Sequence, residues 1–108
     1  MDSSATVPEE LQAPAGSLLD GEDPTSVHLE DPEHWVAVYS ELFESTQRML
    51  AGAQERLDSE AANERADLKL VEREISALVA RSELFAARLR WWGMRGRELW
   101  VETREGKA

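Results

Sequence analysis

Arginine and tryptophan side chains alternate along the stretch RLRWWGMRGRELW, which runs from residue 88 to residue 100 and holds three of the four tryptophans. Both residue types are enriched at the energetic centres of protein–protein interfaces, because an indole ring buries a large area and a guanidinium donates several hydrogen bonds. The same pair can stack on bases and bind phosphates. We therefore expect a recognition surface here, for a protein partner or, alternatively, for a nucleic acid.

The distribution of charge favours the protein partner. The chain has a formal net charge of -10, and residues 1–33 contain nine acidic residues and neither Lys nor Arg. Residues 81–108 contain seven basic and four acidic residues, a local excess of only +3. An acidic head of this kind would compete with a polyanion for the arginines. A nucleic-acid-associated regulator, with the acidic head as a masking element, is therefore the alternative function.

Two histidines lie among carboxylates near residue 30, in a pattern that superficially resembles a metal site. His28 and His34 are close to Glu30, Asp31 and Glu33, but the chain has no cysteine and no later histidine to complete a fixed ligand set. The sequence also lacks a phosphate-binding glycine loop, a nucleophile elbow and a zinc-binding helix motif. We expect no metal, no cofactor and no catalytic residues, and hence a protein that is not an enzyme.

A first helix is predicted over about residues 32–57. Asp31 is suited to cap its first amide groups, Pro32 suits the first helical position, and Glu33 interacts favourably with the helix dipole. The apolar residues then recur every three or four positions, as expected for one face of a helix. They are Trp35, Val36, Tyr39, Leu42, Phe43, Thr46, Met49, Leu50, Ala53 and Leu57.

A second helix is predicted over about residues 64–92, with an irregular or helical extension over 93–100 and a flexible C-terminal tail over 101–108. Its apolar seam alternates steps of four and three, and Ser82 is the only polar member. The seam consists of Leu68, Val71, Ile75, Leu78, Ser82, Phe85, Leu89 and Trp92.

The connection between the two helices leaves two architectures open. The apolar pattern lapses near residues 58–63, where Asp58, Ser59 and Asn63 favour a turn. A turn there gives an all-α, antiparallel helical hairpin, coiled-coil-like, over residues 31–100. Without it, the chain forms one long continuous coiled-coil helix. We favour the hairpin, because helices longer than about 25 residues are uncommon outside coiled coils.

The second helix has a second apolar face, which we define as Leu70, Ala77, Leu84 and Trp91. At about 100 degrees per residue these positions lie opposite the seam, so one hairpin partner leaves them uncovered. We expect self-association into a helical bundle, or binding of another protein, to cover them. The predicted partner-binding residues are Leu84, Arg88, Trp91, Arg95, Arg97 and Trp100.

Residues 1–30 contain three of the four prolines, many acidic residues and no apolar periodicity, so we predict a disordered acidic tail. The acidic start does not resemble a signal peptide, and the sequence has no apolar stretch of membrane-spanning length. We expect a cytoplasmic protein without a membrane segment. Taken together, the pattern indicates a non-catalytic protein–protein interaction module, an adaptor or regulatory subunit that forms a homo-oligomer.

Overall fold

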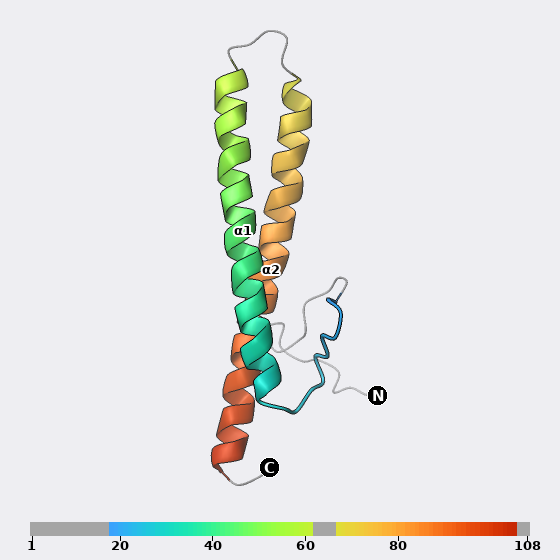
Figure 1. Cartoon of the computed structure of the whole chain (residues 1–108), viewed down its shortest axis with the longest axis vertical. Coiled ribbons are helices and arrows are strands. Elements are labelled where there is room, and N and C mark those ends of the chain that lie inside the picture. The colour runs from blue at the N-terminus through green and yellow to red at the C-terminus, as the bar shows by residue number, and fades with distance from the viewer. Residues whose placement is uncertain (1–17, 62–66, 106–108) are drawn as a thin grey trace, which may run out of the picture.

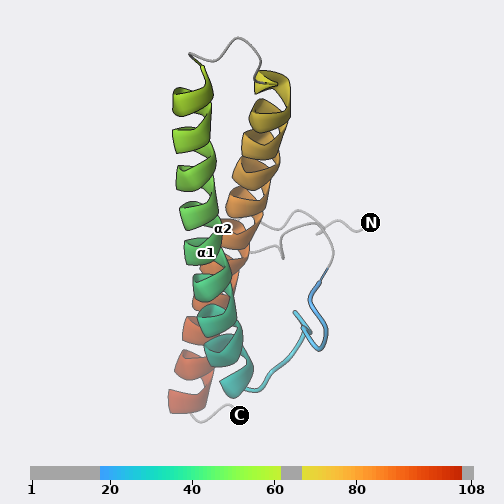
Figure 2. The same cartoon turned by 45° about the horizontal axis from the view of Figure 1, so that its top comes forward.

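The computed structural model describes residues 18–61 and 67–105, and its two helices pack side by side as an antiparallel hairpin (Figures 1 and 2). Helix α1 spans Glu30–Glu60 and helix α2 spans Leu68–Arg104. The described ranges contain no strand. The predicted all-α hairpin is confirmed, and the alternative of one continuous helix is wrong.

The helices are longer than the sequence predicts. Helix α1 begins at Glu30 and ends at Glu60, beyond both ends of the predicted range 32–57. Helix α2, predicted from about residue 64, begins at Leu68. Helix α2 then continues through Gly93 and Gly96 to Arg104, so the extension is helical, and so is part of the segment predicted as a flexible tail. Of the turn predicted over residues 58–63, residues 58–60 belong to α1, and residues 62–63 lie outside the described residues, as does the end of the predicted tail at 106–108.

The two helices begin differently. Leu29 occupies the N-cap position of α1 and makes no side-chain cap, so the prediction that Asp31 caps this helix is wrong. The Asp31 carboxylate instead accepts a hydrogen bond from the Ser26 hydroxyl, which ties α1 to the residues before it. Asp67 caps α2, because its Oδ1 accepts from the backbone amides of Lys69 at 3.2 Å and Leu70 at 3.3 Å.

The hydrophobic core lies where the start of α1 meets the C-terminal half of α2. Trp35, Tyr39 and Trp92 are its buried members, and the rings of Trp35 and Trp92 stack with centroids 6.5 Å apart. The predicted seam of α2 faces α1, and its polar member Ser82 is buried and donates a 2.9 Å hydrogen bond to Gln47 Oε1. The helical periodicity therefore identified the packed face of α2 correctly.

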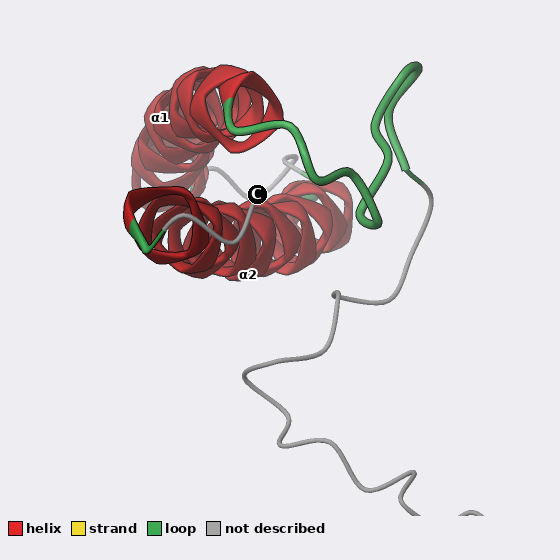
Figure 3. Cartoon of the chain, turned by 90° about the horizontal axis from the view of Figure 1, so that it is seen from below, coloured by secondary structure: helices red, strands yellow, loops and turns green. Residues whose placement is uncertain are grey.

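Residues 18–29, which we call the N-terminal strap, lie beside the lower half of the hairpin in an irregular path (Figures 1 and 3). The prediction of disorder is wrong for this part of the chain, since Glu22 and Ser26 are buried and Leu19 packs against the core. Residues 1–17 of the predicted tail lie outside the described residues. The strap turns at Gly21, whose φ of 83° is costly for any residue with a Cβ.

Candidate functional site

A buried polar cluster connects the strap to both helices, and we call it the Glu22 cluster: Glu22, Tyr39, Arg88 and Trp92. The Tyr39 hydroxyl of α1 donates to Glu22 Oε1 at 2.5 Å, and Trp92 Nε1 of α2 donates to Glu22 Oε2 at 2.8 Å. Arg88 Nη1 donates to the Tyr39 hydroxyl at 2.9 Å and lies 4.0 Å from Glu22 Oε1. One carboxylate thus joins three segments that are far apart in the sequence.

The surroundings of Glu22 favour its charged form. Burial by itself raises the pKa of this carboxyl, but the hydrogen bonds from Trp92, Tyr39 and the Leu19 amide, together with the charge of Arg88, bring it below 4.5. Burial and the neighbouring Glu22 carboxylate raise the pKa of Tyr39 to about 12. The cluster therefore consists of an ionised Glu22, a neutral Tyr39 and the cation of Arg88 at neutral pH.

Arg88 is not part of an exposed surface, contrary to the sequence prediction. Only 2% of this residue is exposed, because its position three residues after Phe85 and four before Trp92 directs it toward the interior. Its Nε and Nη2 atoms are buried without a hydrogen-bond partner among the described residues. In this structure Arg88 therefore faces Tyr39 and Glu22 in the interior and does not contribute to the exposed surface of α2.

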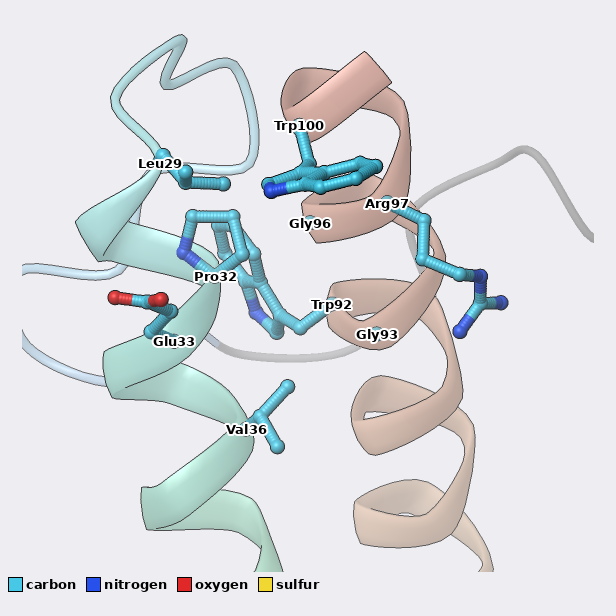
Figure 4. A pocket seen from close by; sticks show the side chains of 9 residues that line it. All are labelled: Leu29, Pro32, Glu33, Val36, Trp92, Gly93, Gly96, Arg97 and Trp100. Atoms are coloured by element: carbon cyan, nitrogen blue, oxygen red, sulfur yellow. The ribbon is translucent and has the colours of Figure 1, made fainter. Parts of the chain in front are cut away.

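A second feature is an open groove of about 600 Å³ between the start of α1 and the C-terminal part of α2 (Figure 4). Trp100 lies across from Leu29 and Pro32, while the charged groups of Glu33 and Arg97 point away from the facing helix. The lining is mainly apolar: Leu29, Pro32, Glu33, Val36, Trp92, Gly93, Gly96, Arg97 and Trp100.

Gly96 makes the close approach beneath this groove possible. A Cβ atom added at Gly96 would lie 3.2 Å from the Pro32 Cβ, tighter than an ordinary van der Waals contact. The sequence left the extension over residues 93–100 as irregular or helical, and α2 is continuous through both Gly93 and Gly96. At Gly96 the absence of a side chain allows the two helices to meet.

The predicted partner-binding residues do not form one surface. Arg97 and Trp100 come together at the groove, where Trp100 is 49% exposed. Arg95 is half-buried, and it donates to the Ser26 carbonyl at 3.3 Å and to Glu98 at 3.2 Å. The remaining two, Leu84 and Trp91, are half-buried, and Trp91 packs edge-on against Trp92 with ring centroids 4.8 Å apart.

Sequence reasoning missed Glu22 and the groove wall formed by Leu29, Pro32 and Val36. A usable signal was present in Arg88, because an arginine between Phe85 and Trp92 on the seam side of a helix requires a buried acceptor. That signal predicts a partner carboxylate without identifying which of the many acidic residues supplies it.

The described ranges contain no group of three or more His, Asp or Glu placed to hold a metal ion, and none of their helices is long and apolar enough to cross a membrane. No protein-family model, curated protein or solved structure matches the chain.

Proposed function

We propose that this protein is a non-catalytic interaction module, an adaptor or regulatory subunit, that binds a segment of a partner protein in the groove between α1 and α2. The observation that carries this proposal is the position of Trp100, half-exposed on the edge of an apolar groove of about 600 Å³. A large aromatic ring beside a concave apolar surface is the usual composition of an interface hot spot.

The groove suggests the chemistry of the partner. A large apolar side chain fits between Trp100 and the wall formed by Leu29 and Pro32, and an acidic neighbour could pair with Arg97 at the rim. The Arg104 guanidinium lies 4.7 Å from the centre of the Trp100 ring and holds positive charge beside it. We therefore expect a partner segment that combines apolar and acidic residues.

Self-association is the second candidate, and it concerns the second apolar face of α2. Leu70 is 58% exposed and Ala77 is exposed, so a second copy could cover this part of the face. Leu84 and Trp91 are half-buried within the single chain, which leaves less apolar area for a second copy than the sequence suggests. A homo-oligomer has correspondingly weaker support than the groove.

Nucleic acid binding is also less well supported than the composition suggests. Arg88 is buried against Tyr39, and Arg95 is engaged by Glu98 and by the strap. These contacts reduce the positive surface that the arginine-rich stretch offers to phosphates.

The test compares Trp100→Ala with Leu70→Ala. Both residues are about half-exposed on α2, but only Trp100 lines the groove. A partner is first identified by co-purification with the full chain, and its affinity is then measured for both variants. We expect Trp100→Ala to weaken binding about tenfold or more while helix content is retained, and Leu70→Ala to change it less than about twofold.

Two other results would overturn the groove as the binding site. If Trp100→Ala binds as tightly as the unaltered chain, partner binding does not depend on the groove. If Leu70→Ala instead weakens binding, or lowers the mass measured in solution by light scattering, the second apolar face of α2 is the interface.

A further inference from the structure

The Glu22 cluster has the construction of a ligand-binding site that the protein's own strap occupies. All the side-chain donors belong to the hairpin, since Tyr39 comes from α1 and both Arg88 and Trp92 come from α2. The acceptor, Glu22, comes from the strap. Trp92 Nε1 and the Tyr39 hydroxyl each contact a different oxygen of the same carboxylate, so the hairpin binds both oxygens at once.

The strap binds through a few separate contacts, as a short peptide ligand would. Leu19 packs against the aromatic core, Glu22 enters the cluster, and the Ser26 carbonyl accepts from Arg95. A tight turn presents the carboxylate, because the Glu22 amide donates to the Leu19 carbonyl at 2.9 Å and Glu22 Oε1 accepts from the Leu19 amide at 3.0 Å. The strap has no helix or strand of its own, so these contacts determine where it lies.

The strap does not use all the hydrogen-bonding capacity of the site. A guanidinium carries five N–H donors, and a carboxylate can engage two of its nitrogens side by side. Arg88 reaches Glu22 only through Nη1, at 4.0 Å, and within the described ranges its buried Nε and Nη2 have no acceptor. Buried donors without an acceptor are unfavourable, so a ligand that satisfies them has an advantage over the strap.

We propose that Tyr39, Arg88 and Trp92 form a carboxylate-binding site for an acidic peptide segment of another protein, and that the strap occupies this site as an intramolecular competitor. The expected ligand carries a Glu or Asp close after an apolar residue, as Glu22 follows Leu19 in the strap. A strap from a second copy would present the same geometry and leave the same Arg88 atoms without acceptors. A different acidic segment is therefore the better occupant.

This site is distinct from the groove, with which it shares only Trp92. The strap is tethered directly to α1 and so has a high effective concentration, on the order of millimolar for a short flexible linker. An external peptide must therefore bind weakly to the unaltered chain. A substitution that weakens the contacts between the strap and the hairpin, within the full chain, should therefore increase the measured affinity of the site for an external peptide.

The experiment uses the full chain carrying Glu22→Gln and two blocked peptides of residues 18–29, one with the native Glu at position 22 and one with Gln. Calorimetry measures affinity, and the NMR signals of the Trp92 indole N–H and the Arg88 Nε–H report whether the ligand reaches the cluster. We expect the Glu peptide to bind at least about tenfold more tightly than the Gln peptide, because hydrogen bonds between charged groups are the stronger kind. We also expect it to bind the unaltered chain about tenfold more weakly than the variant.

Equal binding of the two peptides, or no binding by a variant that retains native helix content, would overturn the proposal. If Glu22→Gln does not fold, Leu19→Ala replaces it, because this change removes an apolar contact of the strap and leaves the Glu22 cluster intact; the same tenfold preference for the Glu peptide is expected. Trp100→Ala serves as the control, since it alters the groove and should leave peptide binding unchanged. This control distinguishes failure of the proposed carboxylate-binding site from failure of the groove as a partner-binding site.

Discussion

The two ends of the hairpin are built differently. At the open end, where α1 begins and α2 finishes, Trp35, Tyr39 and Trp92 are buried together and the strap adds a third layer of contacts. At the tip, which we define as residues 49–60 and 68–79, the only buried residues are Ala53 and Leu78. The open end therefore holds most of the stabilising burial as well as both candidate binding sites, whereas the tip presents mainly exposed or half-exposed side chains.

The difference places the most densely packed part of the hairpin beside both candidate binding sites. Two helices alone bury little surface, and the aromatic rings gain a further cover from Leu19 and Glu22 of the strap. A region with few buried contacts opens more readily than a densely packed one. Substitutions at matched positions in the two ends can test whether the stability is as uneven as the burial.

The largest effect is expected for Trp92→Ala. Trp92 is 1% exposed, stacks on Trp35 and donates to Glu22, so truncation leaves a cavity and removes a donor from a buried carboxylate. The free energy of unfolding should fall by about 3–5 kcal/mol, measured by urea titration. Leu70→Ala at the tip is the control and should cost less than about 1 kcal/mol, since Leu70 is 58% exposed. A similar loss for both variants would contradict the difference between the ends.

The next effect concerns the ionisation of Tyr39, the only tyrosine in the chain. Its pKa in the folded protein is about 12, raised from 10.0 by burial and by Glu22. A raised pKa means that folding favours the neutral phenol, so this stabilisation is complete below pH 10 and is lost as the pH rises through about 12. Absorbance of the phenolate should give a midpoint near 12 for the native chain and near 10 in denaturant. A native midpoint near 10 would indicate that the Glu22 cluster does not form.

The hairpin was predictable because a helical period is a local property that the sequence records directly. The seam from Leu68 to Trp92 recurs at every turn of α2, and it packs toward α1 as expected. The strap was not predictable in this way, because its order depends on Glu22 meeting Trp92, which lies 70 positions along the chain. No local window of sequence contains that contact, so a prediction from the composition of residues 18–29 misses it.

The candidate site was predicted only in part for the same reason. Arg97 and Trp100 were expected at a binding surface, and they line the groove. The opposite wall comes from Leu29, Pro32 and Val36, which only the pairing of the helices brings near them. Arg88 was predicted at the partner-binding surface, but it is buried beside the Glu22 carboxylate of the strap, whose negative charge offsets the burial of the guanidinium.

A smaller effect should distinguish alanine substitutions at two helical glycines, Gly52 at the tip and Gly96 at the open end. An Ala at Gly52 meets nothing within 4 Å, so Gly52→Ala should raise the free energy of unfolding by about 0.5–1 kcal/mol through helix propensity alone. At Gly96 the added methyl would lie 3.2 Å from the Pro32 Cβ, so the helices must move apart to accept it. The cost of this movement offsets the gain from helix propensity. Thermal unfolding of the two variants should therefore show a clear increase in Tm for Gly52→Ala only. An equal increase for both would indicate that the helices do not meet closely at Gly96.

The smallest effect is expected at the ion pair that bridges the helices near the tip, Arg56 with Glu74. Both side chains are about half-exposed, at 50% and 48%, so water and salt screen their attraction. The coupling energy from a double-mutant cycle of Arg56→Ala and Glu74→Ala should be about 0–0.5 kcal/mol, and it should decrease further in high salt. A coupling above about 1.5 kcal/mol would mean that charge pairing compensates at the tip for the burial it lacks. The two ends would then differ in the kind of interaction that stabilises them rather than in its strength, and denser burial would no longer account for the position of both candidate binding sites at the open end.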